Sequence, residues 1–264
     1  MVAELFTPLL DELDVWSRAG VVAGLWWRDD DAAAPSPALE RLTRLGADHG
    51  VACGLAVIPA RTGIGLRDHV LGAPGLLVLQ HGYAHANHAP PGNGAWELGP
   101  HRPMAEILAE LRSGMRTLGD LFGERFVPTV VPPWNRMDPA LLDLLPGLGF
   151  CGVSAEGGTD APAPPPGLRR ADAHCDLLTW KHGPARFAGL EKCVTSIAEH
   201  LKEKRSGRVN PDEPTGILTH HLEMDENAWG FMEDLLSATR SHPAAAWMSP
   251  AEIWPPAAQS KGRP

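Results

Sequence analysis

Cysteines are few in this sequence, and none is spaced for joint metal binding or redox chemistry. The chain has four cysteines and no Cys-x-x-Cys pair, which argues against a zinc ribbon and against a thioredoxin-like motif. We therefore expect the cysteines to be reduced thiols and the protein to occupy a reducing compartment, where disulfides rarely persist. The four residues are Cys53, Cys151, Cys175 and Cys193.

The sequence also lacks an excess of basic residues and any long apolar run. It has 23 Lys and Arg against 32 Asp and Glu, so neither nucleic acid nor an anionic membrane is expected as its main partner. No apolar stretch approaches the roughly 20 residues of a membrane-spanning helix. The first residues lack the basic segment and apolar core of a secretory signal. We therefore expect a cytoplasmic protein; its oligomeric state is not predicted.

Short apolar runs alternate with amphipathic helical patterns, which predicts an α/β fold with parallel strands. The 264 residues are 44% hydrophobic, enough for a large core, and show no internal repeat. Seven or eight such units predict one (β/α) barrel domain over residues 1–264, with a frayed tail from about 255. The predicted strands are 21–27, 51–57, 75–80, 126–131, 149–154, 176–180, 215–219 and a shorter one at 244–248. The predicted helices are 3–18, 36–49, 103–122, 138–148, 189–204 and 227–240.

Three consecutive carboxylates, Asp29, Asp30 and Asp31, follow the first predicted strand. Adjacent carboxylates raise one another's pKa unless a metal or a basic group compensates, so the cluster is a candidate metal and acid/base site. Taken alone, the triplet is explained equally well as the acidic cap of a helix.

A second polar cluster, His-Gly-Tyr-Ala-His at 81–85, follows the third predicted strand. Two histidines four residues apart can bind one ion, whether on a helical turn or in a loop. The alternative is a pair of histidines that only form hydrogen bonds in a polar loop. Because the cluster follows a buried strand, as the aspartates do, the metal interpretation is favoured.

Further unusual side chains follow other strands. Pro-Pro-Trp-Asn-Arg at 132–136 offers a ring for stacking on a sugar and polar groups for its hydroxyls, although a tryptophan in such a turn is often only a plug. His220 and His221 follow the seventh strand, and a Gly/Pro-rich loop at 91–103 suits a pocket mouth. The loops after the strands of a (β/α) barrel meet at one end, so we expect a single pocket.

These motifs together resemble those of NodB-type polysaccharide deacetylases, carbohydrate esterase family four. Residues 28–31, Arg-Asp-Asp-Asp, are similar to the aspartate-pair motif, and 81–85 to the His-[Ser/Thr]-x-x-His metal motif. Residues 132–134 resemble the Arg-x-Pro-Tyr region, and 218–220 the Leu-x-His motif. Their order agrees over about 21–248, and the resemblance is specific as an ensemble.

The resemblance implies a distorted barrel of about seven parallel strands and a divalent metal, usually zinc, bound by one aspartate and two histidines. It also implies that the metal polarises the acetyl carbonyl and activates a water, that the other aspartate takes the proton of the water, and that the Leu-x-His histidine protonates the leaving amine. A metal with three protein ligands keeps open positions for water and substrate.

The triplet can be aligned with the family pair in two registers. In the favoured register Asp30 is the base and Asp31 the ligand; in the other, Asp29 is the base and Asp30 the ligand. His220 is preferred to His221 as proton donor because it fits Leu-x-His. The expected metal ligands are Asp31, His81 and His85, the expected catalytic residues are Asp30, His220 and Asp29, and the expected substrate-binding residues are Arg28, Tyr83, Trp134, Asn135, Arg136 and His221.

The sequence departs from the family in two places. Val131 stands where the family has an arginine that orients the base, and Arg28 and Arg136 are the candidates for that role. The glycine after the aspartate pair is replaced by Ala32, or by Asp31 in the other register. With no export signal visible, we expect a soluble N-acyl sugar or sugar-nucleotide-like substrate in preference to a wall polymer.

The predicted function is a metal-dependent hydrolase that removes an N-acyl group, most often acetyl, from a carbohydrate. One alternative is a non-catalytic carbohydrate-binding barrel with a structural metal, although binding alone does not require a base and an acid beside the ion. A second is a metal-dependent hydrolase of a different amide, and a third is a glycoside hydrolase that uses Asp30 and another acid. Glycosidases with paired carboxylates do not need the two histidines.

Overall fold

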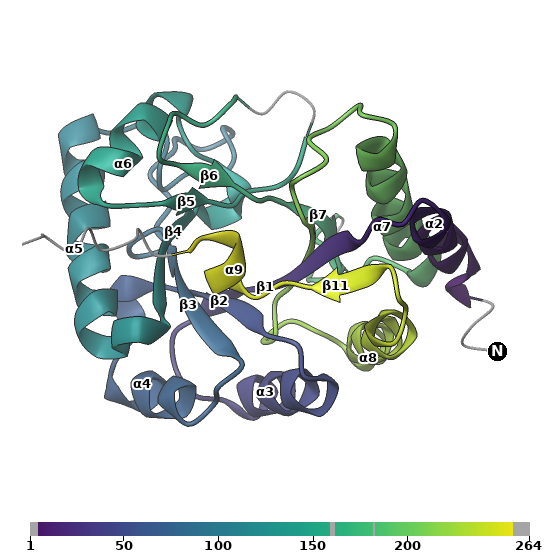
Figure 1. The fold of residues 1–264 in the computed structure, drawn as a ribbon. Coiled ribbons are helices and arrows are strands. Elements are labelled where there is room, and N and C mark those ends of the chain that lie inside the picture. The colour runs from purple at the N-terminus through teal and green to yellow at the C-terminus, as the bar shows by residue number, and fades with distance from the viewer. Residues whose placement is uncertain (1–4, 159–161, 182, 256–264) are drawn as a thin grey trace, which may run out of the picture.

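The computed structural model describes residues 5–158, 162–181 and 183–255 (Figure 1). Within them, a parallel sheet runs in the order β6-β5-β4-β3-β2-β1-β10-β7, and β11 adds a further pairing to β1. Helices cover its outer surface. The strands of this sheet are β1 (Ala23–Ala32), β2 (Cys53–Val57), β3 (Leu76–His81), β4 (Phe126–Val131), β5 (Gly152–Val153), β6 (Arg169–Arg170), β7 (Ala173–Asp176), β10 (Thr215–Thr219) and β11 (Ala245–Trp247).

The first and last strands of the sheet, β6 and β7, are consecutive in the sequence. Only Ala171 and Asp172 separate β6 from β7, and the Ala171 amide donates to the Val153 carbonyl at 3.1 Å. The segment 169–176 is therefore one interrupted strand that pairs with β5 on one side and with β10 on the other. It closes the sheet into a ring of seven strand positions. The expected α/β fold, a distorted barrel of about seven parallel strands, is confirmed.

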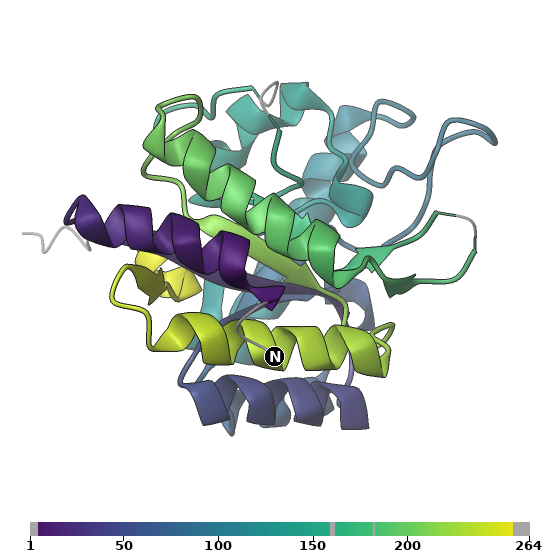
Figure 2. The same ribbon diagram turned by 90° about the vertical axis from the view of Figure 1, so that its right-hand side faces the viewer.

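Four helices form a layer over the β7, β10, β1 and β2 side of the barrel, where α2 packs on α7 and α3 on α8 (Figure 2). α5 and α6 lie on the opposite side, and α9 closes one end of the interior (Figure 1). In the described part of the chain, no helix is both long and apolar enough to cross a bilayer. The helices are α2 (Thr7–Arg18), α3 (Pro37–His49), α4 (Ile64–Leu71), α5 (Met104–Phe122), α6 (Leu145–Leu148), α7 (Leu190–Arg205), α8 (Glu226–Arg240) and α9 (Pro250–Ile253).

Capping residues explain where several helices begin and end. The side chain of Ser36 accepts from the Leu39 amide and begins α3, and Gly50 ends that helix with φ 61°. Asp225 begins α8 in the same manner, by accepting from Ala228. Leu39, Leu42 and Leu45 then form the buried stripe of α3, as their spacing predicts.

Several sequence-based boundaries were wrong. The sixth parallel strand is β7, Ala173–Asp176, whereas the predicted run 176–180 largely forms β8 (Leu178–Thr179), which pairs antiparallel with β9 (Arg186–Phe187). The predicted helix 138–148 is a 3₁₀ segment, Pro139–Leu144, followed by the short α6. α4 was missed, because its eight residues carry only two buried side chains. The predicted tail from 255 and the first residues of the predicted helix at 3–18 lie outside the described residues, apart from Pro255.

The first strand continues through the acidic triplet instead of ending before it. Alternate side chains of a strand point to opposite faces, so Trp26 enters the barrel interior and Trp27 the core beneath the helices. The pairing with β2 advances from Asp29 to Ala32 while β2 advances only from Leu55 to Val57. This is a β-bulge, and Asp31 within it has φ 71°. The bulge breaks the alternation, so that Asp30 and Asp31 both face the cavity at this end of the barrel.

Candidate functional site

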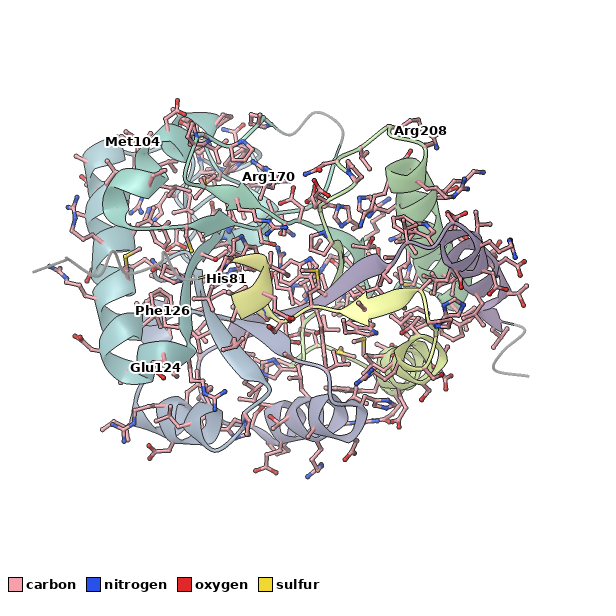
Figure 3. All side chains as sticks on the ribbon, viewed as in Figure 1. His81, Met104, Glu124, Phe126, Arg170 and Arg208 are labelled. Atoms are coloured by element: carbon pink, nitrogen blue, oxygen red, sulfur yellow. The ribbon has the colours of Figure 1, made fainter. Side chains whose placement is uncertain are left out.

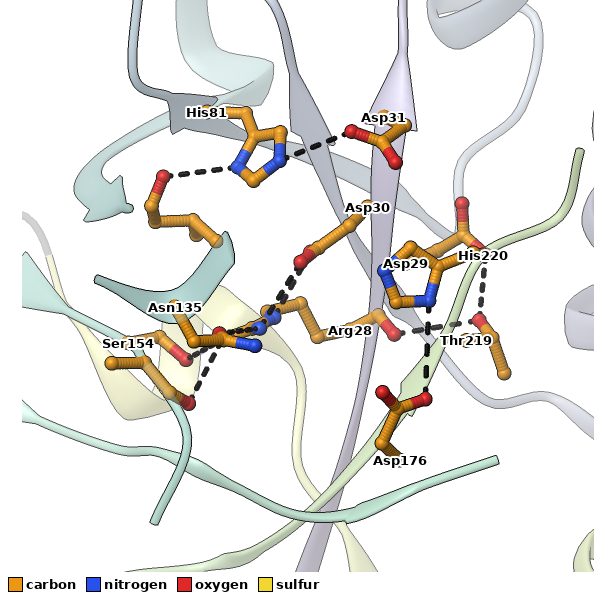
Figure 4. Close-up of polar contacts among 12 residues, drawn as sticks. Arg28, Asp29, Asp30, Asp31, His81, Asn135, Ser154, Asp176, Thr219 and His220 are labelled. Atoms are coloured by element: carbon orange, nitrogen blue, oxygen red, sulfur yellow. Dashed lines mark hydrogen bonds and ion pairs between the residues drawn. The ribbon is translucent and has the colours of Figure 1, made fainter. Parts of the chain in front are cut away.

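Asp31, His81 and His85 converge at the carboxyl ends of β1 and β3. Asp31 Oδ1 lies 3.2 Å from His81 Nε2 and 3.2 Å from His85 Nε2. His81 ends β3 and is buried, whereas His85 sits four residues on with φ 54°. Figure 3 shows His81 on the ribbon, and Figure 4 shows it facing Asp31. In the described residues these three form the one group of side chains with metal-ligand spacing.

The donor set fits a divalent metal such as zinc. Asp31 Oδ1 is buried and has no hydrogen-bond partner, although two imidazole nitrogens lie beside it. The His81 Nδ1–H donates to the Val131 carbonyl at 3.0 Å, which leaves Nε2 free as a ligand. Burial disfavours the charged carboxylate of Asp31, but the neighbouring imidazoles outweigh it and hold its pKa well below the usual range.

Asp30 is held by Arg28, two residues away on the same face of β1. Arg28 Nε lies 3.0 Å from Asp30 Oδ1, and Nη2 donates to Oδ2 at 3.1 Å. The guanidinium also donates to Ser154 Oγ at 2.8 Å and to Asn135 Oδ1 at 2.6 Å (Figure 4). Both members of the pair are buried. Of the two arginines considered for orienting the base, Arg28 contacts Asp30, while Arg136 lies 5.7 Å over the Trp96 ring.

His220 lies across the cavity, at the end of β10. Its Nδ1 faces Asp176 Oδ1 at 3.9 Å (Figure 4). The Trp180 ring lies edge-on to its imidazole, with ring centroids 5.4 Å apart. Burial raises the pKa of Asp176. The sequence reasoning missed this carboxylate. Its position at the end of a strand was the available signal, but 176 was taken as the start of a strand.

The structure does not bring Asp29 or His221 to the cavity. Both are almost completely buried, and Asp29 Oδ1 lies 2.5 Å from His221 Nδ1. Asp29 Oδ2 also accepts from Thr219 Oγ1 at 2.6 Å and from the His221 amide at 2.9 Å. Burial opposes protonation of His221, but the charge of Asp29 outweighs it and raises the pKa of His221. Asp29 and His221 therefore link β1 to the end of β10 through buried hydrogen bonds, outside the cavity.

A cavity of about 850 Å³ gathers the remaining groups. Two tryptophans stand at its rim: Trp134 is 36% exposed with its ring 4.3 Å from that of His85, and Trp180 is 48% exposed. Two of the expected substrate-binding residues, Arg28 and Tyr83, do not line this cavity. The lining includes Asp30, Asp31, His81, His85, Trp134, Asn135, Arg136, Asp176, Trp180, Lys192 and His220.

A larger cavity of about 1060 Å³ lies elsewhere, against α7 between Arg170 and Arg208 (Figure 3). It contains the stacked imidazoles of His174 and His200, with ring centroids 3.4 Å apart. None of the groups around Asp31 lines it. The smaller cavity is therefore the candidate active site.

No family model and no curated protein matches the chain in sequence. Solved structures do match its fold. A putative polysaccharide deacetylase from Mycobacterium smegmatis has a TM-score of 0.57 at 15% identity, covering 87% of each chain. A T48 deacetylase with substrate has a TM-score of 0.54 at 14% identity, covering 89% of this chain and 92% of its own.

A third match is a mutant of a pseudoenzyme of carbohydrate esterase family four, with restored enzymatic activity. Its TM-score is 0.54 at 13% identity, and the match covers 89% of this chain and 68% of the other. The chain therefore has the fold of the family-four polysaccharide deacetylases, as the sequence motifs led us to expect. Since that fold also occurs in a pseudoenzyme, activity has to be argued from the side chains.

Proposed function

We propose that this protein is a metal-dependent hydrolase that removes an N-acetyl group from a carbohydrate. The observation that carries the proposal is the placement of three different functions in one cavity. A candidate metal site, Asp31 with two histidines, lines the same cavity as a buried carboxylate, Asp30, and an imidazole, His220. An amide hydrolase needs this combination, whereas a sugar-binding protein does not.

Asp30 is placed to accept the proton of the attacking water. Arg28 contacts its carboxylate through two nitrogens, which fixes the orientation of that carboxylate toward the cavity. Arg28 is itself fixed by Asn135 and Ser154. The base therefore has little freedom to turn away from the cavity.

His220 is placed to protonate the leaving nitrogen. Asp176 faces its Nδ1, so Nε2 is the nitrogen available to a substrate. Trp180 packs edge-on against the ring and limits its rotation. The sequence thus supplies a base and an acid from two different strands, β1 and β10.

Asp31, His81 and His85 would hold the metal, which when bound supplies a Lewis acid for the acyl carbonyl and lowers the pKa of water. The zinc assignment rests on the donor set of two imidazoles and one carboxylate. Cobalt and nickel tolerate the same ligands.

The proposed substrate is a small N-acyl sugar. The exposed rings of Trp134 and Trp180 offer apolar faces at the rim, and Asn135 and Arg136 offer polar groups beside them. The preference for a soluble substrate over a wall polymer, and the cytoplasmic location with it, stay predictions from the sequence.

The test is the metal content of the purified protein beside that of His81→Ala, with acetate release from N-acetylated sugars assayed on both. We expect one metal per chain in the wild type, a loss of that metal in the variant, and acetate release only from the wild type. A wild type that holds no metal after exposure to zinc would contradict the proposal. Metal binding without acetate release would favour the non-catalytic barrel, and cleavage of glycosides instead would favour a glycosidase.

A further inference from the structure

Glu97 is a buried carboxylate in the loop between β3 and α5, outside the groups assigned above. It is 0% exposed, although residues 90–94 of the same loop are exposed. Its Oε1 accepts from the Ala84 amide at 2.7 Å, and its Oε2 accepts from the Tyr83 amide at 3.2 Å. Both amides belong to the turn that ends at the candidate metal ligand His85.

That turn has an unfavourable backbone conformation. Gly82 and His85 both have left-handed backbone, with φ 53° and 54°, and this conformation is unfavourable for a residue such as histidine. Three other hydrogen bonds attach the turn: the Gly82 amide donates to the Val131 carbonyl at 3.1 Å, the Gly82 carbonyl accepts from Gln80 Nε2 at 3.0 Å, and the Tyr83 carbonyl accepts from the Ala60 amide at 2.8 Å. Glu97 supplies the acceptors for the two amides that lie between Gly82 and His85.

Glu97 also occupies space that a side chain at position 82 would need. A Cβ built on Gly82 would lie 2.0 Å from Glu97 Oε2. The metal motif of the family that the chain resembles has serine or threonine here, whereas this chain has glycine. The carboxylate of Glu97 can therefore occupy its position only because residue 82 has no side chain.

The backbone next to Glu97 is fixed by packing and by a hydrogen bond. Leu98, next in sequence, is fully buried in the core around α5, and its carbonyl accepts from the Asp138 amide at 2.8 Å. Because its neighbour is fixed in this way, Glu97 has a defined position from which to hold the turn.

We propose that Glu97 is a positioning residue for the metal site: it fixes the backbone of residues 83–84 and thereby places the imidazole of His85 against Asp31. The inference rests on the proposed metal site. It makes the loop 86–103 part of that site, since the loop carries the anchoring carboxylate. Outer groups of this kind raise metal affinity by restricting the ligands.

The test is the affinity of the full-length protein for Zn²⁺, measured by competition with a chromogenic chelator. Glu97→Gln keeps the shape but replaces one acceptor with an amide that faces a backbone N–H. We expect zinc to bind about 10- to 100-fold more weakly to this variant, and at least as weakly to Glu97→Ala. Glu110→Gln is the matched control, because Glu110 pairs with Arg102 at the other end of the same loop, and zinc affinity should stay within about 2-fold of the wild type.

Co²⁺ absorption spectra provide a second readout, which a general loss of stability would not change. In Glu97→Gln the spectrum of the bound ion should shift, because one imidazole ligand is displaced. Unchanged zinc affinity in a folded Glu97→Gln would overturn the inference, as would an equal loss in Glu110→Gln. If Glu97→Ala does not fold, Glu97→Gln decides. A wild type that does not bind zinc would instead contradict the proposed function.

Discussion

Arg28 and Asp30 lie two residues apart on β1, and their side chains meet through two contacts of 3.0 and 3.1 Å inside the barrel. The strand geometry causes the meeting, because residues i and i+2 project from the same face. In the proposed mechanism, Arg28 on β1 takes the role of the arginine that the motif of the resembled family places before the Pro-Pro turn, where this sequence has Val131.

Arg28→Lys should slow the reaction while leaving the metal in place. An ammonium group cannot reproduce a planar, two-nitrogen contact with Asp30 and also reach Asn135 and Ser154. We expect kcat to fall by about 10²-fold, as for a misplaced catalytic group. Turnover and metal content measured on one preparation check this. Wild-type turnover in Arg28→Lys would show that the orientation of Asp30 does not depend on the guanidinium.

The two aspartates in the cavity should respond differently to the same change. Asp30→Asn should retain the metal and lose about 10² to 10⁴ in kcat, the usual contribution of a general base. Asp31→Asn should lose the metal, because a neutral amide is a poor substitute for the carboxylate between two imidazoles. Metal analysis of both variants distinguishes the registers. Loss of metal from Asp30→Asn with retention in Asp31→Asn would favour the register in which Asp30 is the ligand.

Asp29→Ala should destabilise the folded protein. Asp29 is fully buried and accepts from Thr219 and His221, so its removal leaves buried donors without partners. We expect the free energy of unfolding to fall by about 3 kcal/mol or more, as when a buried ion pair loses one member. Urea denaturation measures the change. An unfolding free energy equal to that of the wild type, with turnover abolished, would point instead to a catalytic Asp29.

Periodicity was sufficient to predict most of the fold, because most strands of this barrel are short apolar runs and most of the covering helices have an apolar stripe. Val51 to Val57 and Leu76 to Gln80 are clear examples. The hairpin at β8 and β9 was missed since its strands have two residues each. The 3₁₀ segment at Pro139–Leu144 carries leucines like a helix, and composition does not distinguish the two.

The site was predictable where a motif followed a strand, as for His81, and less so where the geometry depends on pairing. The bulge that turns Asp31 toward His85 arises from the register of β1 against β2, which the sequence of β1 alone does not contain. Glu97 lies in a loop without periodicity, so no pattern indicated that its carboxylate is buried. Asp176 was included in a predicted strand, but as its first residue, whereas in the structure it is the last residue of β7.

His200 should make the protein sensitive to acid, away from the active site. Burial and the charge of Lys204 lower the pKa of His200 from 6.5 to about 3, so the folded state keeps this imidazole neutral where the unfolded chain protonates it. Between these pH values the unfolded chain binds more protons, and stability therefore falls as the pH falls. His200 should contribute about 1.4 kcal/mol per pH unit to that slope. Urea denaturation from pH 7 to pH 4 should show a shallower slope for His200→Gln than for the wild type, while His88→Gln, at an exposed histidine, should match the wild type. Equal slopes in all three proteins would show that His200 titrates alike in both states.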